Sequence, residues 1–187
     1  MSIDEFIEQF NETYPDVDRH EVATDEMIAE YERKLGYHLP MSFVEFLKKF
    51  SNGLFLLDCE PIGGVSIDSP CSDICKVSSI LPDIPHEVLL AETNERIESA
   101  RLVSFTKFDA GDISNNHWVF LCEDGVPNYE YRVGFVSQSS KKIVKVLDNF
   151  EEWLFLFWEN DCEDESGTSV FDILYPDYDE RCDVLDV

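Results

Sequence analysis

Side chains capable of chemistry are scattered along this chain of 187 residues. The four histidines are isolated from one another, and none belongs to a pair with metal-ligand spacing: His20, His38, His86 and His117. The sequence contains no nucleophile elbow, no phosphate-binding loop and no zinc-protease motif. Adjacent carboxylates are expected by chance among 40 acidic residues, so they do not indicate acid–base catalysis. The sequence therefore predicts no enzyme, and an enzyme would require a titratable cluster that only the fold assembles.

Two short segments contain potential metal ligands. Asp109, Asp112 and Asn115 carry oxygen ligands, but they lack the ligand order of a calcium loop, so a turn between strands is the preferred interpretation. Cys71 and Cys75 lie four residues apart without a CxxC partner. We therefore expect no metal, no cofactor, and cysteines that remain free thiols in a reducing compartment.

Charge is the main feature of the composition: 40 acidic and 14 basic residues give a net charge of −26. Such a surface repels phosphate groups, which disfavours direct binding to nucleic acid or to an anionic membrane. A basic protein is the complementary partner, and the alternative is that the charge provides only solubility. The N-terminus lacks the features of a signal peptide, and the longest apolar run, 153–158, is too short to span a bilayer. A cytoplasmic location is expected.

Residues 24–53 carry the clearest structural pattern. Thr24 suits a helix N-cap, Gly36 suits the left-handed residue that ends a helix, and apolar side chains between them share one face. Pro40 suits the first position of a second helix, which would end at Asn52-Gly53. The buried stripe of this second helix would consist of Phe43, Phe46, Leu47 and Phe50.

The pattern resembles the SUKH superfamily, the cell-wall-regulator-like domains found widely in bacteria. The residues that carry the resemblance are Leu35-Gly36, Leu39-Pro40, Phe43, Phe46, Leu47 and Asn52-Gly53, followed in order by Phe105 to Asp112, His117 to Leu121 and Phe150 to Leu154. The resemblance covers most of residues 24–158 and is loosest over 68–98. It implies an α+β fold in which N-terminal helices and a C-terminal helix pack on a mainly antiparallel, twisted sheet of about five or six strands.

Hydrophobic periodicity and turn residues predict the remaining elements. Helices are expected over 2–11, 85–99 and 150–160, with one helical turn over 73–79. Strands are expected over 54–57, 63–67, 102–107, 117–122, 129–136 and 143–147, the central ones forming a meander. A single domain would cover residues 1–160, and 161–187 would form an acidic tail whose residues 170–174 pack on the body.

The resemblance also implies a function, because SUKH domains serve as immunity proteins that bind and neutralise a cognate toxin, often a nuclease. Nuclease toxins are commonly basic, and an acidic inhibitor has the complementary charge. We therefore predict stoichiometric occlusion of a toxin by carboxylates on loops and tail, with a cytosolic regulatory or scaffold module as the alternative. The candidate contacts, for each of which the alternative is an ordinary solvated turn residue, are Asp58, Glu60, Asp68, Asp73, Asp109, Asp112, Glu123 and Asp124.

Overall fold

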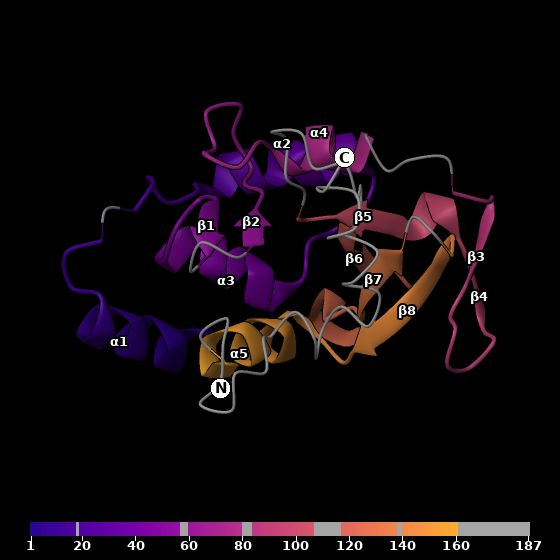
Figure 1. The fold of residues 1–187 in the computed structure, drawn as a ribbon. Coiled ribbons are helices and arrows are strands. Elements are labelled where there is room, and N and C mark those ends of the chain that lie inside the picture. Colours follow the sequence, from indigo (N-terminus) through magenta and orange to yellow (C-terminus); the bar gives the residue numbers. More distant parts are fainter. Residues whose placement is uncertain (18, 57–59, 80–83, 107–116, 138–139, 161–187) are drawn as a thin grey trace, which may run out of the picture.

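A computed structural model describes residues 1–17, 19–56, 60–79, 84–106, 117–137 and 140–160 (Figure 1). The elements in these ranges are α1 (Ile3–Thr13), α2 (Asp25–Leu35), α3 (Met41–Lys49), β1 (Leu54–Leu56), β2 (Glu60–Ile62), α4 (Ile74–Ser79), β3 (Glu87–Leu89), β4 (Arg96–Glu98), η1 (Ser99–Arg101), β5 (Leu102–Ser104), β6 (His117–Leu121), η2 (Pro127–Tyr129), β7 (Val133–Ser137), β8 (Lys142–Leu147) and α5 (Phe150–Asn160). Here η denotes a 3₁₀ helix. No helix in these ranges is both long enough and apolar enough to span a bilayer.

A four-stranded antiparallel meander in the order β5-β6-β7-β8 forms the centre of the fold. Two antiparallel hairpins extend it at its edges. The β1-β2 hairpin joins next to β5 through a bridge between Ile62 and Thr106, and the β3-β4 hairpin joins β8 through a parallel bridge between Leu90 and Ile143. The predicted α+β class and the predicted meander are confirmed.

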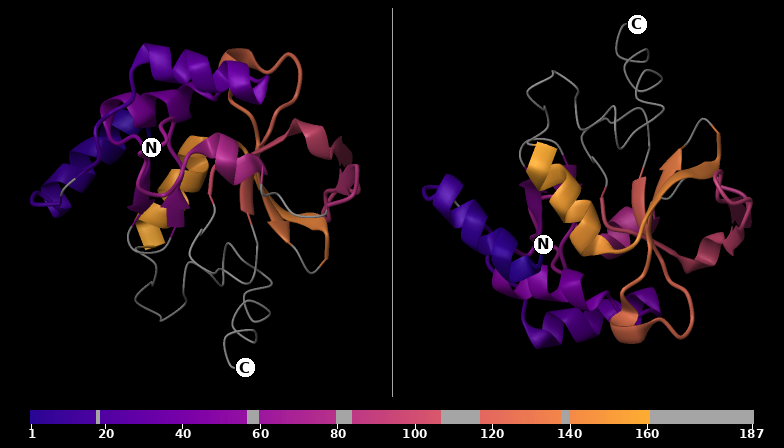
Figure 2. Two further views of the ribbon diagram at one scale, coloured as in Figure 1. Left: turned by 90° about the horizontal axis from the view of Figure 1, so that it is seen from above. Right: turned by 90° about the horizontal axis from the view of Figure 1, so that it is seen from below.

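Hydrophobic side chains cover both faces of the meander, because alternate residues of a strand point to opposite faces. All five residues of β6 are buried. Trp118 and Phe120 face the main core, formed with α1, α3 and α5, whereas Val119 and Leu121 face a smaller core under the β3-β4 hairpin. Figures 1 and 2 show this arrangement, with α1 and α5 along one side of the molecule and α2 and α4 along the other.

The helix ends follow the sequence signals closely. Met27 N donates to Thr24 Oγ1 over 3.3 Å at the start of α2, and Gly36 ends that helix with a φ of +78°. At the start of α5, Glu152 N donates to Asn149 Oδ1 over 2.9 Å. Pro40 lies one residue earlier than predicted, because it precedes Met41, the first residue of α3.

The helix predicted over 85–99 is wrong, because this segment forms the β3-β4 hairpin and then η1. Val88 and Leu90 lie two residues apart and are both buried, which is the period of a strand. Asn94 adopts a φ of +60° in the connecting turn. The many glutamates that suggested an exposed helix face are exposed strand and turn residues instead.

Two predicted strands are misplaced. The strand predicted over 63–67 forms instead at Glu60–Ile62, because Gly63 and Gly64 belong to a loop in which Gly64 N donates to Ser72 O. The strand predicted to begin at Tyr129 begins at Val133, because Pro127–Tyr129 form a 3₁₀ turn. The helical turn predicted over 73–79 is confirmed as α4. The predicted packing of residues 170–174 lies outside the described residues.

Candidate functional site

A groove lies between the C-terminal end of α2 and the loop that joins β6 to β7. Its volume is about 650 Å³. One wall comes from α2 and from Gly36, Tyr37 and His38, and the other wall comes from residues 123–131. We call this feature the α2 groove. It combines exposed aromatic rings with carboxylates, as the following contacts show.

Aromatic rings in the α2 groove are held in place by specific contacts. Tyr129 is 43% exposed, and its ring stacks on the ring of His38 with the centroids 4.4 Å apart. His38 Nδ1 lies 3.0 Å from Glu32 Oε2, and the hydroxyl of Tyr37 donates to Ala100 O over 3.0 Å. The buried Tyr131 lies behind them, and burial raises its pKa to about 12. The groove therefore presents oriented rings.

The backbone that displays Tyr129 is strained. Asn128 and Tyr129 both adopt left-handed conformations, with φ values of +54° and +56°. Asparagine tolerates this region, but tyrosine seldom adopts it, and such a residue stores about 1–3 kcal/mol of strain. Hydrogen bonds from Glu130 N to Pro127 O and from Tyr131 N to Tyr129 O maintain the turn. Strain at an exposed aromatic residue is typical of a binding site.

Glu130 anchors the same loop to the N-terminus of α3. Pro40 provides no side-chain cap for this helix, and Glu130, which lies 88 residues beyond Ser42, takes that role. Its carboxylate accepts from Ser42 N and Ser42 Oγ, each over 2.7 Å. The negative charge also interacts favourably with the helix dipole. These hydrogen bonds thus hold the neighbouring Tyr129 in a fixed position relative to α3.

We expect Glu130→Ala to lower the free energy of unfolding by about 2 kcal/mol, because it leaves the half-buried end of α3 without its cap. Urea denaturation followed by circular dichroism measures the change. Glu8→Ala, at an exposed position of α1, is the matched control and should change stability by less than about 0.5 kcal/mol. If both variants lost the same free energy of unfolding, the hydrogen bonds of Glu130 would stabilise the fold no more than the exposed carboxylate of Glu8 does.

Two predicted contact residues, Glu123 and Asp124, lie at the rim of the α2 groove. Each already pairs with an arginine. Arg132 donates to both carboxylate oxygens of Glu123, over 2.7 and 3.0 Å, and Arg101 Nη2 donates to Asp124 Oδ2 over 2.8 Å. The hydrogen bond from Arg101 lowers the pKa of Asp124. An arginine therefore holds each of the two carboxylates in position.

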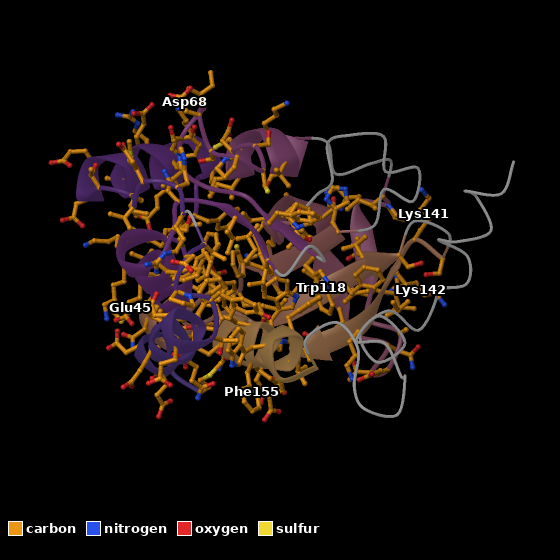
Figure 3. The ribbon with its side chains drawn as sticks, turned by 60° about the vertical axis from the view of Figure 1, so that its left-hand side comes forward. Glu45, Asp68, Trp118, Lys141, Lys142 and Phe155 are labelled. Atoms are coloured by element: carbon orange, nitrogen blue, oxygen red, sulfur yellow. The ribbon has the colours of Figure 1, made fainter. Side chains whose placement is uncertain are left out.

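The other predicted contact residues do not join this groove in the described part of the chain. Asp68 does not line the groove. It is exposed beside Ile67, which is 84% exposed, and Figure 3 shows it at the surface, well away from the basic pair Lys141 and Lys142. Asp73 caps α4 by accepting from Lys76 N over 3.0 Å. Glu60 is described only through its backbone in β2. Asp58, Asp109 and Asp112 lie outside the described residues.

The sequence analysis did not single out Tyr37, His38, Tyr129 or Tyr131 as site residues. A signal was present in Tyr129-Glu130-Tyr131, which follows the turn-forming pair Pro127-Asn128. Exposed aromatic residues after a turn are candidates for binding. Their proximity to His38 could not be inferred from the sequence, because the two segments are about 90 positions apart and meet only through the sheet.

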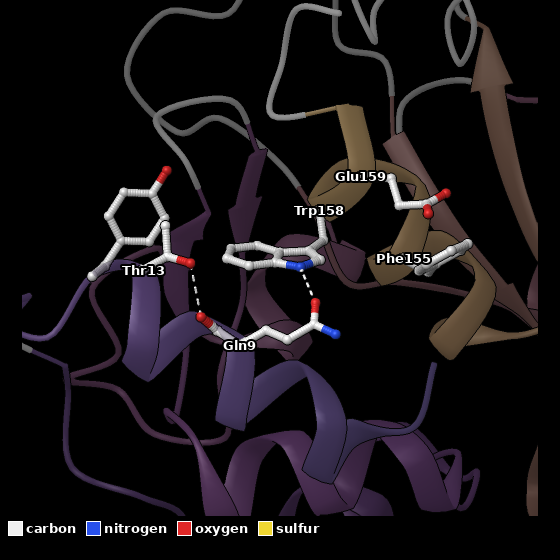
Figure 4. A pocket seen from close by; sticks show the side chains of 6 residues that line it. Gln9, Thr13, Phe155, Trp158 and Glu159 are labelled. Carbon is white, nitrogen blue, oxygen red and sulfur yellow. Dashed lines mark hydrogen bonds between the residues drawn. The ribbon is translucent and has the colours of Figure 1, made fainter.

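A second hollow lies between α1 and α5 and has a volume of about 340 Å³ (Figure 4). Trp158 Nε1 donates to Gln9 Oε1 over 2.7 Å, and the Trp158 ring contacts Phe6 and Phe10. Among the described residues that line it, Glu159 carries the only carboxylate. These contacts attach α1 to α5, and we interpret the hollow as part of the packing interface between the two helices.

Reactive and metal-binding groups are sparse in the described residues. They contain no group of three or more histidine, cysteine or acidic side chains placed to hold a metal ion. Burial raises the pKa of Cys71 to about 11 and the pKa of Cys122 to about 12, so both thiols are protonated at neutral pH and unreactive. His117 is buried with Nδ1 2.8 Å from Ser104 Oγ, an arrangement within the core.

The fold defines a class, an α+β domain whose helices flank an antiparallel meander, and the described part of this chain adds an aromatic, acidic groove. The model of the SMI1 / KNR4 family (SUKH-1) matches residues 22–155, and the chain belongs to this family. This family consists in general of non-catalytic immunity or regulator domains and is generally associated with binding a toxin partner. No curated protein matches the chain. The resemblance predicted from the sequence is confirmed.

Proposed function

We propose that the protein is an immunity protein that binds and neutralises a cognate bacterial toxin in the cytoplasm, and that the toxin is a basic nuclease. The observation that carries the proposal is the α2 groove, in which a strained and exposed Tyr129 stands beside carboxylates at the rim. Binding would occlude the phosphate-binding surface of the nuclease. The inhibitor itself performs no chemistry.

Tyrosine is one of the residues that most often dominate the energy of a protein interface. The contacts of Tyr129, His38 and Tyr37 hold their rings before a partner arrives, so little side-chain entropy is lost on binding. The net charge of −26 supplies long-range attraction to a basic partner. Such steering raises association rates from roughly 10⁵–10⁶ M⁻¹s⁻¹ toward 10⁸ M⁻¹s⁻¹ or more at low salt.

The test is to sequence the genes next to this one and to co-express the protein with any toxin that they encode, combined with a Tyr129→Asn variant. Asparagine tolerates the left-handed backbone, so this change removes the ring without adding strain. We expect the parent protein to protect cells and to form a stable complex, and Tyr129→Asn to weaken the complex by about 30-fold, or about 2 kcal/mol. Val22→Ala, at a position that is 47% exposed, is the control and should bind as the parent does.

Salt dependence provides a second readout of the same complex. Electrostatic attraction between exposed charges weakens as the Debye length falls from about 10 Å at 0.1 M salt to about 3 Å at 1 M. The association rate, measured by surface plasmon resonance, should therefore fall steeply with ionic strength. Absence of both protection and complex formation with the adjacent toxin would refute the immunity proposal.

A cytosolic regulatory or scaffold role is the second candidate, and one observation favours it. Glu123 and Asp124 are already paired with Arg132 and Arg101, which reduces the charge they offer to a basic toxin. A scaffold would bind several partners through the same rings with modest affinity and weak salt dependence. Tight binding to one basic partner with a steep salt dependence would distinguish the immunity protein from this alternative.

A further inference from the structure

We propose that the α2 groove receives an arginine side chain of the partner protein, with the guanidinium stacked on Tyr129 and hydrogen-bonded to Asp124 and Glu32. This inference rests on the proposed function, because it specifies the chemical group that the groove recognises. It concerns a defined pocket of the surface and not the overall charge of the chain.

The aromatic part of this pocket suits a planar cation. The Tyr129 ring stacks on His38 and lies 6.3 Å from the ring of Tyr131, centroid to centroid, and the residue remains 43% exposed. A guanidinium within about 6 Å of a tyrosine ring centroid is attracted by the ring quadrupole. The chain itself contains such a contact, since Arg19 Cζ lies 5.0 Å from the centroid of the Phe50 ring.

Carboxylates around the rings retain hydrogen-bonding capacity. Arg101 binds Asp124 only through Oδ2, and the Asp124 side chain is 87% exposed. Glu32 Oε1 accepts a hydrogen bond from Leu39 N over 2.9 Å, and Glu32 Oε2 lies 3.0 Å from His38 Nδ1. Each ionised carboxylate offers about four acceptor positions, so both can accept further donors. An arginine presents five donors in a planar fork, so it can donate to carboxylates while its face stacks on a ring.

The charges of the groove favour arginine over other ligands. Glu32, Glu123 and Asp124 repel an anion, and they outnumber Arg33, the exposed arginine of the lining. Lysine carries the same charge but lacks the planar group that stacks on a ring while donating in its own plane. A neutral side chain can donate hydrogen bonds to the carboxylates but has no positive charge to pair with theirs. The geometry therefore points to a guanidinium.

Three short peptides test the proposal: acetyl-Gly-Xaa-Gly-amide with arginine, lysine or citrulline at Xaa. Citrulline has nearly the shape of arginine without its charge, so the comparison isolates the cation. Each is titrated into the full-length protein at low salt and followed by ¹H–¹⁵N NMR. We expect the arginine peptide to shift the signals of His38, Asp124 and Tyr129, and to bind at least about fivefold more tightly than the citrulline peptide. The lysine peptide should lie between them.

Variants locate the site. Tyr129→Asn should remove the preference for arginine over lysine, and Tyr129→Phe, which retains a ring, should preserve most of it. Asp124→Asn should weaken binding of the arginine and lysine peptides alike. The parent spectrum outside the groove serves as the check that each variant is folded.

Two outcomes overturn the inference: equal binding of the arginine and citrulline peptides, or an arginine preference that Tyr129→Asn leaves intact. A failure of the proposed immunity function would give a different set of results from a failure of this inference. If the arginine preference depends on Tyr129 but the adjacent toxin is neither bound nor neutralised, the groove recognises arginine and the immunity role is wrong. If the toxin is neutralised while the peptides show no preference, only the present inference fails.

Discussion

Replacement of Phe6 by alanine is expected to lower the free energy of unfolding by about 3–5 kcal/mol, the typical effect of removing a fully buried aromatic side chain. Phe6 is 0% exposed, and its ring contacts those of Phe46, Phe50 and Trp158 at centroid distances of 5.1–6.3 Å. Urea unfolding monitored by tryptophan fluorescence and circular dichroism measures the loss. Glu8→Ala in the same helix is the matched control and should leave the transition unchanged.

This result would define where the folded domain begins. The family match starts at residue 22, whereas α1 covers Ile3–Thr13 and contributes Ile3, Phe6 and Phe10 to the main core. We therefore expect a chain that begins at residue 15 to expose apolar surface and to aggregate. A truncated chain that unfolded at the same urea concentration as the full chain would show α1 to be an accessory helix.

Gly64→Ala is expected to destabilise the fold by at least about 3 kcal/mol, because a side chain at this position overpacks the interior. An added Cβ would collide with Ser69 Oγ and Asn52 O, and would lie 2.6 Å from Asn52 Oδ1. One of these atoms belongs to the backbone, so a rotamer change cannot relieve the contact. Thermal unfolding and urea unfolding both measure the effect.

Gly36→Ala is the comparison that separates the steric clash at Gly64 from the general cost of replacing a glycine by alanine. Gly36 has a φ of +78°, but an added Cβ there meets no atom within 4 Å. Its replacement should destabilise by only about 1–2 kcal/mol, the energy of a left-handed alanine. Similar losses at both positions would mean that the loop around Gly64 adjusts to the methyl group.

The same loop explains the Asn52-Gly53 pair of the family pattern. The side chain of Asn52 is buried, and its Oδ1 accepts from Val65 N over 2.7 Å. Gly53 adopts a φ of +96° and lies close to Gly64 N and Ile62 O. The pair therefore connects the end of α3 to the segment after β2 through a hydrogen bond and a close backbone approach. Its role is structural, and the surface that we propose for binding lies elsewhere, at the α2 groove.

The sequence predicted the helices well because their signals are local. Thr24, Gly36 and Asn149 act through hydrogen bonds and dihedral angles within a few residues of the helix ends. The aromatic stripe of α3 is also a local pattern, and Phe43, Phe46, Leu47 and Phe50 are all buried. The meander followed from short apolar runs separated by turn residues.

The errors occurred where tertiary contacts decide the structure. Residues 85–99 carry enough glutamate to favour a helix, but pairing with β8 and the small core under Val88, Leu90 and Ile97 make them a hairpin. A segment this short has weak intrinsic preferences, and tertiary packing overrides them. The strand at Glu60–Ile62 likewise depends on its bridge to Thr106, which lies more than 40 residues away.

The sequence by itself determined the family, the α+β class, the limits of α2 and α5 and the acidic character of this protein, since each depends on composition or on neighbouring residues. Only the tertiary structure decided which acidic residues share a surface and which rings stand beside them. Tyr129 meets His38, and Glu130 caps α3, because the meander brings the β6–β7 loop back to the helix pair. Contacts between distant segments depend on strand register, which no single stretch of sequence encodes.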